Sequence, residues 1–263
     1  MIAGIFHSGS GVGNQLHRYV ATKVLALDKG YDFGMVAPDL CKVKDFMSLD
    51  MGKVTGICYE SKLPEGKTLP FECSFKAKLP VWEEKTNYYN PEFNFIEDIT
   101  IIDGEFQDER YFEHRLQEID KWLRVEPINI PGDVCVIGFR GGEFYTVPEL
   151  GLPKEYFDEG VRKMLEINPN MKFEVHTDDL LGARNFFGWN DLKIIHDVGI
   201  NWRSMRYAKY AIIANSSFYI LPRLLKHHDW PDTTVTIAPR YWDRYNIKKW
   251  ERPYNYYKKF TYV

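Results

Sequence analysis

The sequence lacks several features that would define a class of protein at once. Its four cysteines do not have the spacing of metal ligands, so four reduced thiols are expected. A formal net charge of −3 predicts no basic face, and nucleic acid is therefore not expected as a partner. No apolar run is long enough to cross a bilayer, and the apolar stretch from Met1 is too short for a signal peptide. We therefore expect a cytoplasmic protein without a transmembrane segment. The cysteines are Cys41, Cys58, Cys73 and Cys135.

The sequence does contain an alternation of strand and helix patterns, which is typical of α/β proteins with parallel sheets. Residues 2–6 are predicted to form a buried strand, residues 7–13 a glycine loop, and residues 14–28 an amphipathic helix. This order opens a Rossmann-like unit. Residues 31–95 predict only short strands and loops, because Pro and Gly recur there. The apolar face of the first helix is expected to carry Leu16, Val20, Val24 and Leu27.

The second half of the chain alternates more regularly. A turn cluster at residues 129–133 predicts a boundary between two Rossmann-like domains, residues 1–131 and residues 132–263. The aromatic tail from residue 242 is expected to pack back onto the body of the protein. The expected strands are 134–139, 171–176, 193–196, 211–214 and 234–238. The expected helices are 112–123, 154–167, one that ends at 187, 201–210 and 216–227.

Polar residues directly after these strands are the candidates for a binding site, because open α/β sheets bind ligands at the carboxyl ends of their strands. Arg140 can hydrogen-bond phosphate oxygens. A carboxylate of Asp178 or Asp179 can accept hydrogen bonds from the N–H groups of guanine. The segment Asn215-Ser216-Ser217 opens a helix, where hydroxyl and N–H groups favour an anion. Together these residues predict a site for a nucleoside diphosphate.

Ordinary structural roles are open to the same residues. Ser216 and Asp178 can each cap the helix that follows, and Arg140 can pair with Glu143. The glycine loop Gly9-x-Gly11-x-Gly13 departs from the spacing of dinucleotide-binding proteins, so a nicotinamide or flavin enzyme is not indicated.

Six segments, in order along the chain, resemble those of the α-1,2-fucosyltransferases (glycosyltransferase family 11). Residues 11–16 are similar to the family's Gly-Leu-Gly-Asn-Gln-Met/Leu loop, and residues 104–112 to its Gly-Tyr-Phe-Gln-Ser-Glu-Lys-Tyr-Phe segment. Residues 134–144 fall where the family has a strand leading into His-x-Arg-Arg-x-Asp. The other similar segments are Thr-Asp-Asp at 177–179, the stretch 205–218 that ends in Ala-Asn-Ser-Ser-Phe, and Ala-Pro with Trp at 238–242.

The resemblance implies a GT-B-like fold, in which two Rossmann-like domains form a central cleft and the second domain holds the donor. It implies transfer of fucose from GDP-fucose to a glycan acceptor in α-1,2 linkage, with inversion and with neither a cofactor nor a metal ion. The absence of any Asp-x-Asp agrees with this, since that motif is typical of the metal-dependent GT-A class. The implied donor-binding residues are Arg140, Asp178, Asp179, Asn215, Ser216 and Ser217. The residues implied on the acceptor side of the cleft are Gly13, Asn14, Gln15 and His17.

The chain departs from the family at several of these positions. Gly138 replaces the motif's His, Gly141 its second Arg and Glu143 its Asp. Arg140 and Glu143 are the catalytic candidates, Arg140 for charge on the leaving diphosphate and Glu143 as the general base. The departures leave two alternatives open: a GT-B enzyme with another nucleotide sugar, or a glycan-binding module without activity.

Overall fold

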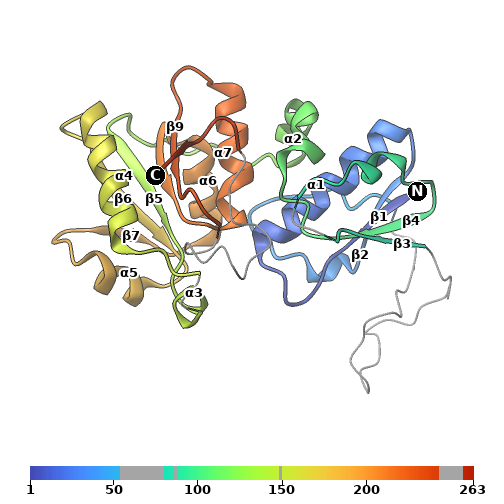
Figure 1. The fold of residues 1–263 in the computed structure, drawn as a ribbon, viewed down its shortest axis with the longest axis horizontal. Helices are drawn as coiled ribbons and strands as arrows, with labels where there is room; N and C mark the ends of the chain where they lie inside the picture. The colour runs from blue at the N-terminus through green and yellow to red at the C-terminus, as the bar shows by residue number, and fades with distance from the viewer. Residues whose placement is uncertain (54–79, 86–87, 148–149, 243–256) are drawn as a thin grey trace. The chain divides into compact units, whose positions relative to one another are not determined.

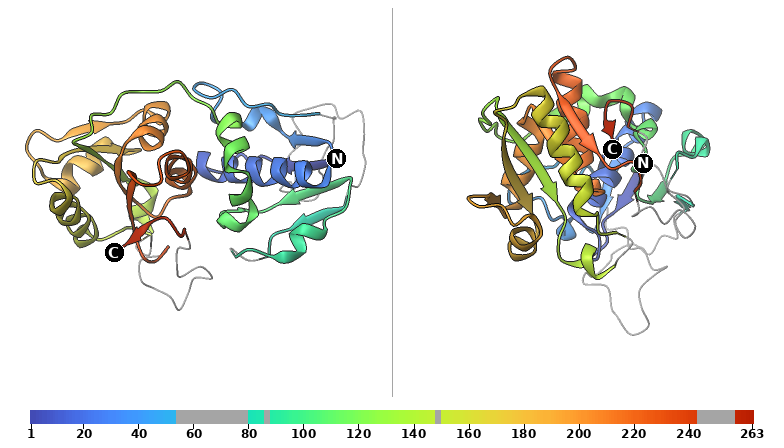
Figure 2. Two further views of the ribbon diagram at one scale, coloured as in Figure 1. Left: turned by 90° about the horizontal axis from the view of Figure 1, so that it is seen from above. Right: turned by 60° about the vertical axis from the view of Figure 1, so that its left-hand side comes forward.

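The computed structural model describes residues 1–53, 80–85, 88–147, 150–242 and 257–263, which are drawn in Figures 1 and 2. Contacts divide the chain into two compact units. Unit 1 comprises Met1–Lys44 and Ser48–Arg115, and unit 2 comprises Asp45–Met47 and Leu116–Val263. The expected boundary after residue 131 falls later than this, because helix α2 (Leu116–Trp122) packs against α7 (Ser217–Asp229) of unit 2.

Unit 1 is built on a parallel sheet with the strand order β2-β1-β4-β3. In this sheet Ile2 lies opposite Phe33 on one side and Thr100 on the other. The strands are short and apolar, as buried parallel strands are. They are β1 (Ile2–Ile5), β2 (Phe33–Val36), β3 (Val81–Glu83) and β4 (Thr100–Asp103). No strand was predicted at the position of β4.

Helix α1 (Val12–Lys29) joins β1 to β2 and packs against both strands. It ends at Gly30, whose φ of 66° is left-handed and therefore suits glycine. Leu16, Val20 and Val24 are buried as predicted, but Leu27 is wrong, since it is 47% exposed near the end of the helix. The remaining regular segments described in unit 1 are short 3₁₀ helices at Pro38–Leu40, Pro91–Phe95, Glu109–Tyr111 and Glu113–Arg115.

Unit 2 is built on a second parallel sheet with the order β10-β9-β8-β5-β6-β7. Its strands are β5 (Val134–Phe139), β6 (Lys172–Thr177), β7 (Lys193–Ile195), β8 (Tyr210–Ile213), β9 (Val235–Ala238) and β10 (Thr261–Tyr262). Its other helices are α3 (Glu143–Thr146), α4 (Lys154–Ile167), α5 (Leu180–Phe187) and α6 (Val198–Tyr207). From residue 132 onward the predicted strands and helices are therefore confirmed, with ends that differ by up to three residues.

The helices of unit 2 cover both faces of its sheet. Right-handed crossovers place α4 and α5 on one face, while α6 and α7 pack together on the other. Figure 1 shows α4 on one side of β5 and α6 and α7 on the opposite side. The described end of the tail returns as expected, because β10 pairs with β9 and Tyr257 is buried, while residues 243–256 lie outside the described residues.

The strand order decides where side chains converge. In unit 2 the order reverses between the adjacent strands β5 and β8, and in unit 1 β1 and β4 are adjacent at the centre of the sheet. The carboxyl ends of such adjacent strands are the usual ligand-binding positions of open α/β sheets. Within the described ranges, no helix combines the length and apolarity that crossing a bilayer requires.

Candidate functional site

Three strands of unit 2 bring the predicted donor-binding residues to one edge of the sheet. Arg140 follows β5, Asp178 follows β6 and Asn215 lies two residues after β8. Strand β5 pairs with both β6 and β8, so the segments after these strands are neighbours. Phe139 lies opposite Thr177 and Gly138 opposite Ile213, which sets the register of this edge.

An ion pair joins two of these segments. Arg140 Nη1 lies 2.5 Å from Asp178 Oδ2, and the other oxygen of Asp178 accepts a hydrogen bond from Gly141 N at 2.9 Å. The guanidinium carbon also lies 4.8 Å from the centre of the Phe144 ring. Asp178 is thus a partner of Arg140, and the pairing with Glu143 that the sequence suggested is not tested. The side chain of Glu143, the first residue of α3, lies outside the described part of the structure.

Asp179 is the N-cap of α5. Its carboxylate accepts hydrogen bonds from Gly182 N at 2.8 Å and from Gly142 N at 3.0 Å. These backbone N–H groups stabilise the charged form and lower the pKa of Asp179 below its ordinary value. The two adjacent carboxylates, Asp178 and Asp179, therefore fasten the Gly141-Gly142 loop to the end of β6.

The segment after β8 combines a buried amide with a helix cap. Asn215 is 2% exposed, and its Nδ2 donates to Leu150 O at 3.0 Å and Trp242 O at 2.5 Å. Its Oδ1 is a buried acceptor without a hydrogen-bond partner in the described structure. Ser216 caps α7 by accepting a bond from Phe218 N at 3.4 Å, and the half-buried Ser217 begins the helix. The amino end of a helix with these groups favours an anion.

Two glycines in this edge leave no room for the side chains that family 11 has there. A Cβ on Gly138 would lie 2.7 Å from ring atoms of Tyr219 and 2.9 Å from the methyl group of Met205. A Cβ on Gly141 would lie 2.5 Å from Cβ of Asp179. The departures from the His-x-Arg-Arg-x-Asp pattern are therefore accompanied by neighbours that fill the space.

The predicted acceptor-side residues all lie on the first turns of α1 in unit 1. Gln15 is 1% exposed and bridges the segment after β2, because it donates to Leu40 O and accepts from Lys42 N. His17 is fully buried, with Nδ1 2.9 Å from Gly13 O and its ring against Phe112. Gly13 is buried as well, and Asn14 is half-buried, so Asn14 is the one of these four that is partly open.

A further polar group at the edge of unit 1 was not singled out from the sequence. His7 follows β1, and its Nε2 lies 2.9 Å from Oδ1 of Asp103, the last residue of β4. Arg18 reaches the same carboxylate at 3.6 Å and donates to Gly104 O at 2.8 Å. A histidine directly after the first strand was the available signal, but its partner could not be found without predicting β4.

A chain of amides and carboxylates adjoins this group. Gln107 Nε2 donates to Asn14 Oδ1 and to Glu105 Oε2, each at 3.0 Å. Burial raises the pKa of Glu105 above its ordinary value, while nearby Arg18 opposes the shift. Asn14 is thus bonded to a residue of the 104–112 segment, and the two motifs that carry the family resemblance in unit 1 meet here.

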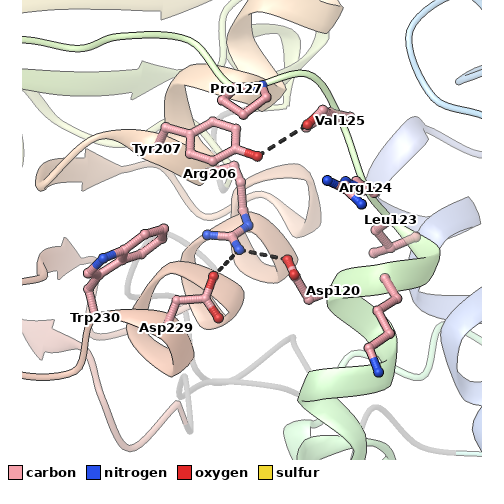
Figure 3. Close-up of a pocket in the computed structure, with 10 residues that line it drawn as sticks. Asp120, Leu123, Arg124, Val125, Pro127, Arg206, Tyr207, Asp229 and Trp230 are labelled. Atoms are coloured by element: carbon pink, nitrogen blue, oxygen red, sulfur yellow. Dashed lines mark hydrogen bonds and ion pairs between the residues drawn. The ribbon is translucent and has the colours of Figure 1, made fainter.

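A cavity of about 380 Å³ lies elsewhere in unit 2 (Figure 3). Arg206 projects between Asp120 and Asp229, bonds to both, and is 4% exposed. Tyr207 donates to Val125 O at 3.2 Å. These residues precede β8 and β9, so the cavity lies at the amino ends of the strands, away from the predicted binding edge. The contacts connect α2 to α6 and α7, which gives them a structural role.

Comparisons with known proteins agree with this architecture. Neither the protein-family models nor the curated proteins contain a match to the sequence. Among solved structures, the crystal structure of NodZ alpha-1,6-fucosyltransferase soaked with GDP-fucose matches with a TM-score of 0.51 and 12% identity, over 85% of this chain and 91% of that chain. The glycosyl transferase family 9 structure from Veillonella parvula DSM 2008 matches with a TM-score of 0.46 and 12% identity, over 100% of this chain and 86% of that chain. The E. coli heptosyltransferase WaaC with ADP matches with a TM-score of 0.45 and 10% identity, over 100% of this chain and 93% of that chain.

The likeness to NodZ is one of fold. Together with the two parallel sheets, it confirms the predicted α/β class with two Rossmann-like units of the GT-B type. Membership of family 11 remains a resemblance carried by the sequence segments, and the roles of the site residues remain predictions.

Proposed function

We propose that this protein is a glycosyltransferase that moves a sugar from a nucleoside-diphosphate sugar to a hydroxyl group of a glycan. The observation that carries the proposal is the convergence of Arg140, Asp178 and Asn215 at the point where the strand order of unit 2 reverses. The fold shared with a fucosyltransferase supports it.

Unit 2 would bind the donor through its diphosphate and base. A guanidinium carries five N–H donors in a planar fork, so Arg140 can hold Asp178 and a phosphate oxygen together. Ser216, Ser217 and the amino end of α7 add donors and partial positive charge. A carboxylate can accept up to about four hydrogen bonds, so Asp178 or Asp179 can also accept from a base.

Catalysis would come from these same groups. Negative charge grows on the diphosphate as the bond to the sugar breaks, and a preorganised guanidinium and helix terminus stabilise it most at that moment. In this proposal neither a metal ion nor a cofactor takes part. Glu143 stays the sequence-based candidate for the general base.

GDP-fucose is the donor we propose first, with inversion and an α-1,2 linkage. The support comes from the ordered segments that resemble family 11, and the NodZ structure of similar fold was soaked with GDP-fucose. A different nucleotide sugar is the second candidate. The observation that favours it is the lack of space at Gly138 and Gly141, where the family's His and second Arg would contact the donor.

Thermal shift with nucleotides tests the proposal. The purified chain is heated with GDP, UDP or CMP and with their sugar conjugates, each with and without EDTA. A ligand at about 100 times its Kd stabilises the folded state by roughly 2.7 kcal/mol, which is readily measured. We expect GDP and GDP-fucose to raise Tm in both conditions.

The other outcomes separate the alternatives. A shift with UDP alone would retain the transferase and replace the donor. A shift that EDTA abolishes would contradict the metal-free mechanism. No shift with any nucleotide, combined with binding to oligosaccharides, would favour a glycan-binding module without transfer activity.

A further inference from the structure

The carboxyl edge of the unit 1 sheet contains a histidine-carboxylate pair at the ends of its two central strands. His7 follows β1 and Asp103 ends β4, and these strands are hydrogen-bonded neighbours. His7 Nε2 lies 2.9 Å from Asp103 Oδ1, with the histidine 38% and the aspartate 14% exposed. The imidazole thus stands open at one side while its carboxylate partner is held within the unit.

The contact decides which ring nitrogen can accept a proton. A carboxylate accepts a hydrogen bond, so Nε2 donates to Asp103 and the lone pair is left on Nδ1. Fixing the tautomer and stabilising the imidazolium is what a carboxylate does for a histidine base in known catalytic pairs. Arg18, which is 3% exposed, holds the position of the Asp103 carboxylate from within the unit.

We propose that His7, oriented by Asp103, is the general base that takes the proton from the acceptor's hydroxyl group. This rests on the proposed transfer function. The hydroxyl O–H bond breaks and its proton moves to Nδ1 of His7. The oxygen forms the new bond to the anomeric carbon of the donor. The bond from that carbon to the diphosphate breaks, and the nucleoside diphosphate leaves with the electron pair.

The neighbouring amides supply polar groups of the kind that bind sugar hydroxyls. The bonded series Asn14, Gln107 and Glu105 lies beside the pair, and the charge on His7 is felt by Glu105. The groups that face His7 electrostatically are therefore Asp103 on β4, Arg18 on α1 and Glu105 on the segment after β4. The surroundings of His7 therefore contain two carboxylates and one guanidinium.

The same unit contains a matched pair with a different location. His114 Nε2 lies 2.7 Å from Asp28 Oδ2, and Arg115 Nη2 lies 2.8 Å from the other oxygen of Asp28. The residue types are those of the His7 group, but Asp28 lies in the last turn of α1, far from the end of β1 along the helix. If the role of His7 depends on its position at the strand edge, substitution of His7 should lower kcat and substitution of His114 should not.

The test compares His7→Gln, Glu143→Gln and the control His114→Gln with the wild-type chain. Sugar transfer from the donor that gives the thermal shift is measured against pH, with lactose, cellobiose and chitotriose as acceptor probes. Nucleotide thermal shift and Tm are measured on each variant. We expect His7→Gln to lower kcat by at least about 100-fold and to remove the rise of kcat with pH, while nucleotide shift and Tm stay at the wild-type values. The His114→Gln variant should keep the wild-type kcat.

Four results would overturn the proposal. Wild-type kcat in His7→Gln, or loss of the pH-dependent limb in Glu143→Gln instead, would refute the histidine base and leave the transferase function intact. Equal losses of kcat, nucleotide shift and Tm in His7→Gln would give His7 a structural role. A wild-type chain that transfers sugar from no donor would refute the proposed function and the histidine base together.

Discussion

The carboxyl edges of the two sheets use similar residues in different ways. In unit 2 the carboxylates of Asp178 and Asp179 bind backbone N–H groups of the Gly141-Gly142 loop, and Arg140 binds Asp178. In unit 1 the Asp103 carboxylate binds side chains, those of His7 and Arg18. The carboxylates of the unit 2 edge thus bind a backbone loop, and the carboxylate of the unit 1 edge binds the imidazole of His7.

The carboxyl edges of two parallel sheets can therefore carry polar groups suited to two kinds of chemistry. Backbone N–H groups, a guanidinium and a helix terminus suit a charged leaving group. A carboxylate-bound imidazole suits the transfer of a proton near neutral pH. The pKa shifts of carboxylates at the two edges have opposite signs. Backbone N–H donors lower the pKa of Asp179, whereas burial raises the pKa of Glu105.

The largest effect should come from removing the cation of the unit 2 edge. Arg140→Ala is expected to lower sugar transfer by at least about 100-fold and to weaken the nucleotide thermal shift, because the leaving diphosphate loses its guanidinium. Arg162→Ala removes an exposed arginine that pairs with Glu159 and Glu166 on α4 and should leave both readouts unchanged. Turnover of Arg140→Ala within a few-fold of wild type would contradict the phosphate role.

A second change tests the close packing beneath the same edge. Gly138→Ala forces a methyl group against Tyr219 and Met205, and we expect a loss of about 2 kcal/mol in the free energy of unfolding. Gly132→Ala is the control, because nothing lies within 4 Å of its added Cβ. Denaturant unfolding measures both variants. Equal stability of the two would show that Tyr219 moves aside and that the motif's His could have been accommodated.

The smallest effects distinguish the carboxylates of the two edges by pH. Asp179 has a lowered pKa, so its contribution is present above the unfolded value of 3.8 and is lost as pH falls through the folded value. Asp179→Asn should therefore destabilise the protein by about 1 kcal/mol at pH 7 and progressively less in acid, because the amide nitrogen that replaces one oxygen cannot accept the bond from Gly142 N. Glu105 has a raised pKa, so its contribution is greatest below 4.5 and is lost as pH rises through the folded value.

Substitution of Glu105 should consequently change the stability in the opposite direction to substitution of Asp179. Glu105→Gln is expected to stabilise the protein by up to about 1 kcal/mol at pH 7, with the difference vanishing below pH 4.5. Urea unfolding at a series of pH values measures both carboxylates. Parallel pH profiles for the two variants would refute the contrast between the edges.

Most of the second unit could be predicted from local patterns. Its strands are buried runs, and its helices alternate with them at short spacing, so periodicity and turn residues place each element to within a few residues. The first unit was harder, because Pro and Gly recur in residues 31–95 and interrupt the periodicity there. At the junction of the two units, the helix predicted at 112–123 is a 3₁₀ turn followed by α2. The prediction that Leu27 is buried was wrong, because the apolar face of a helix is buried only as far as the sheet beneath it extends.

Local sequence patterns are enough to predict an α/β protein, polar residues after its strands, and six segments that resemble family 11. Those properties depend on hydrophobic periodicity and on neighbours along the chain. Only the tertiary structure decided that Arg140 binds Asp178, that Gln15 and His17 are buried, and that His7 meets Asp103 across 96 positions of sequence. These outcomes depend on strand order and register, because parallel pairing brings the ends of distant strands together and no local pattern records which strands are adjacent.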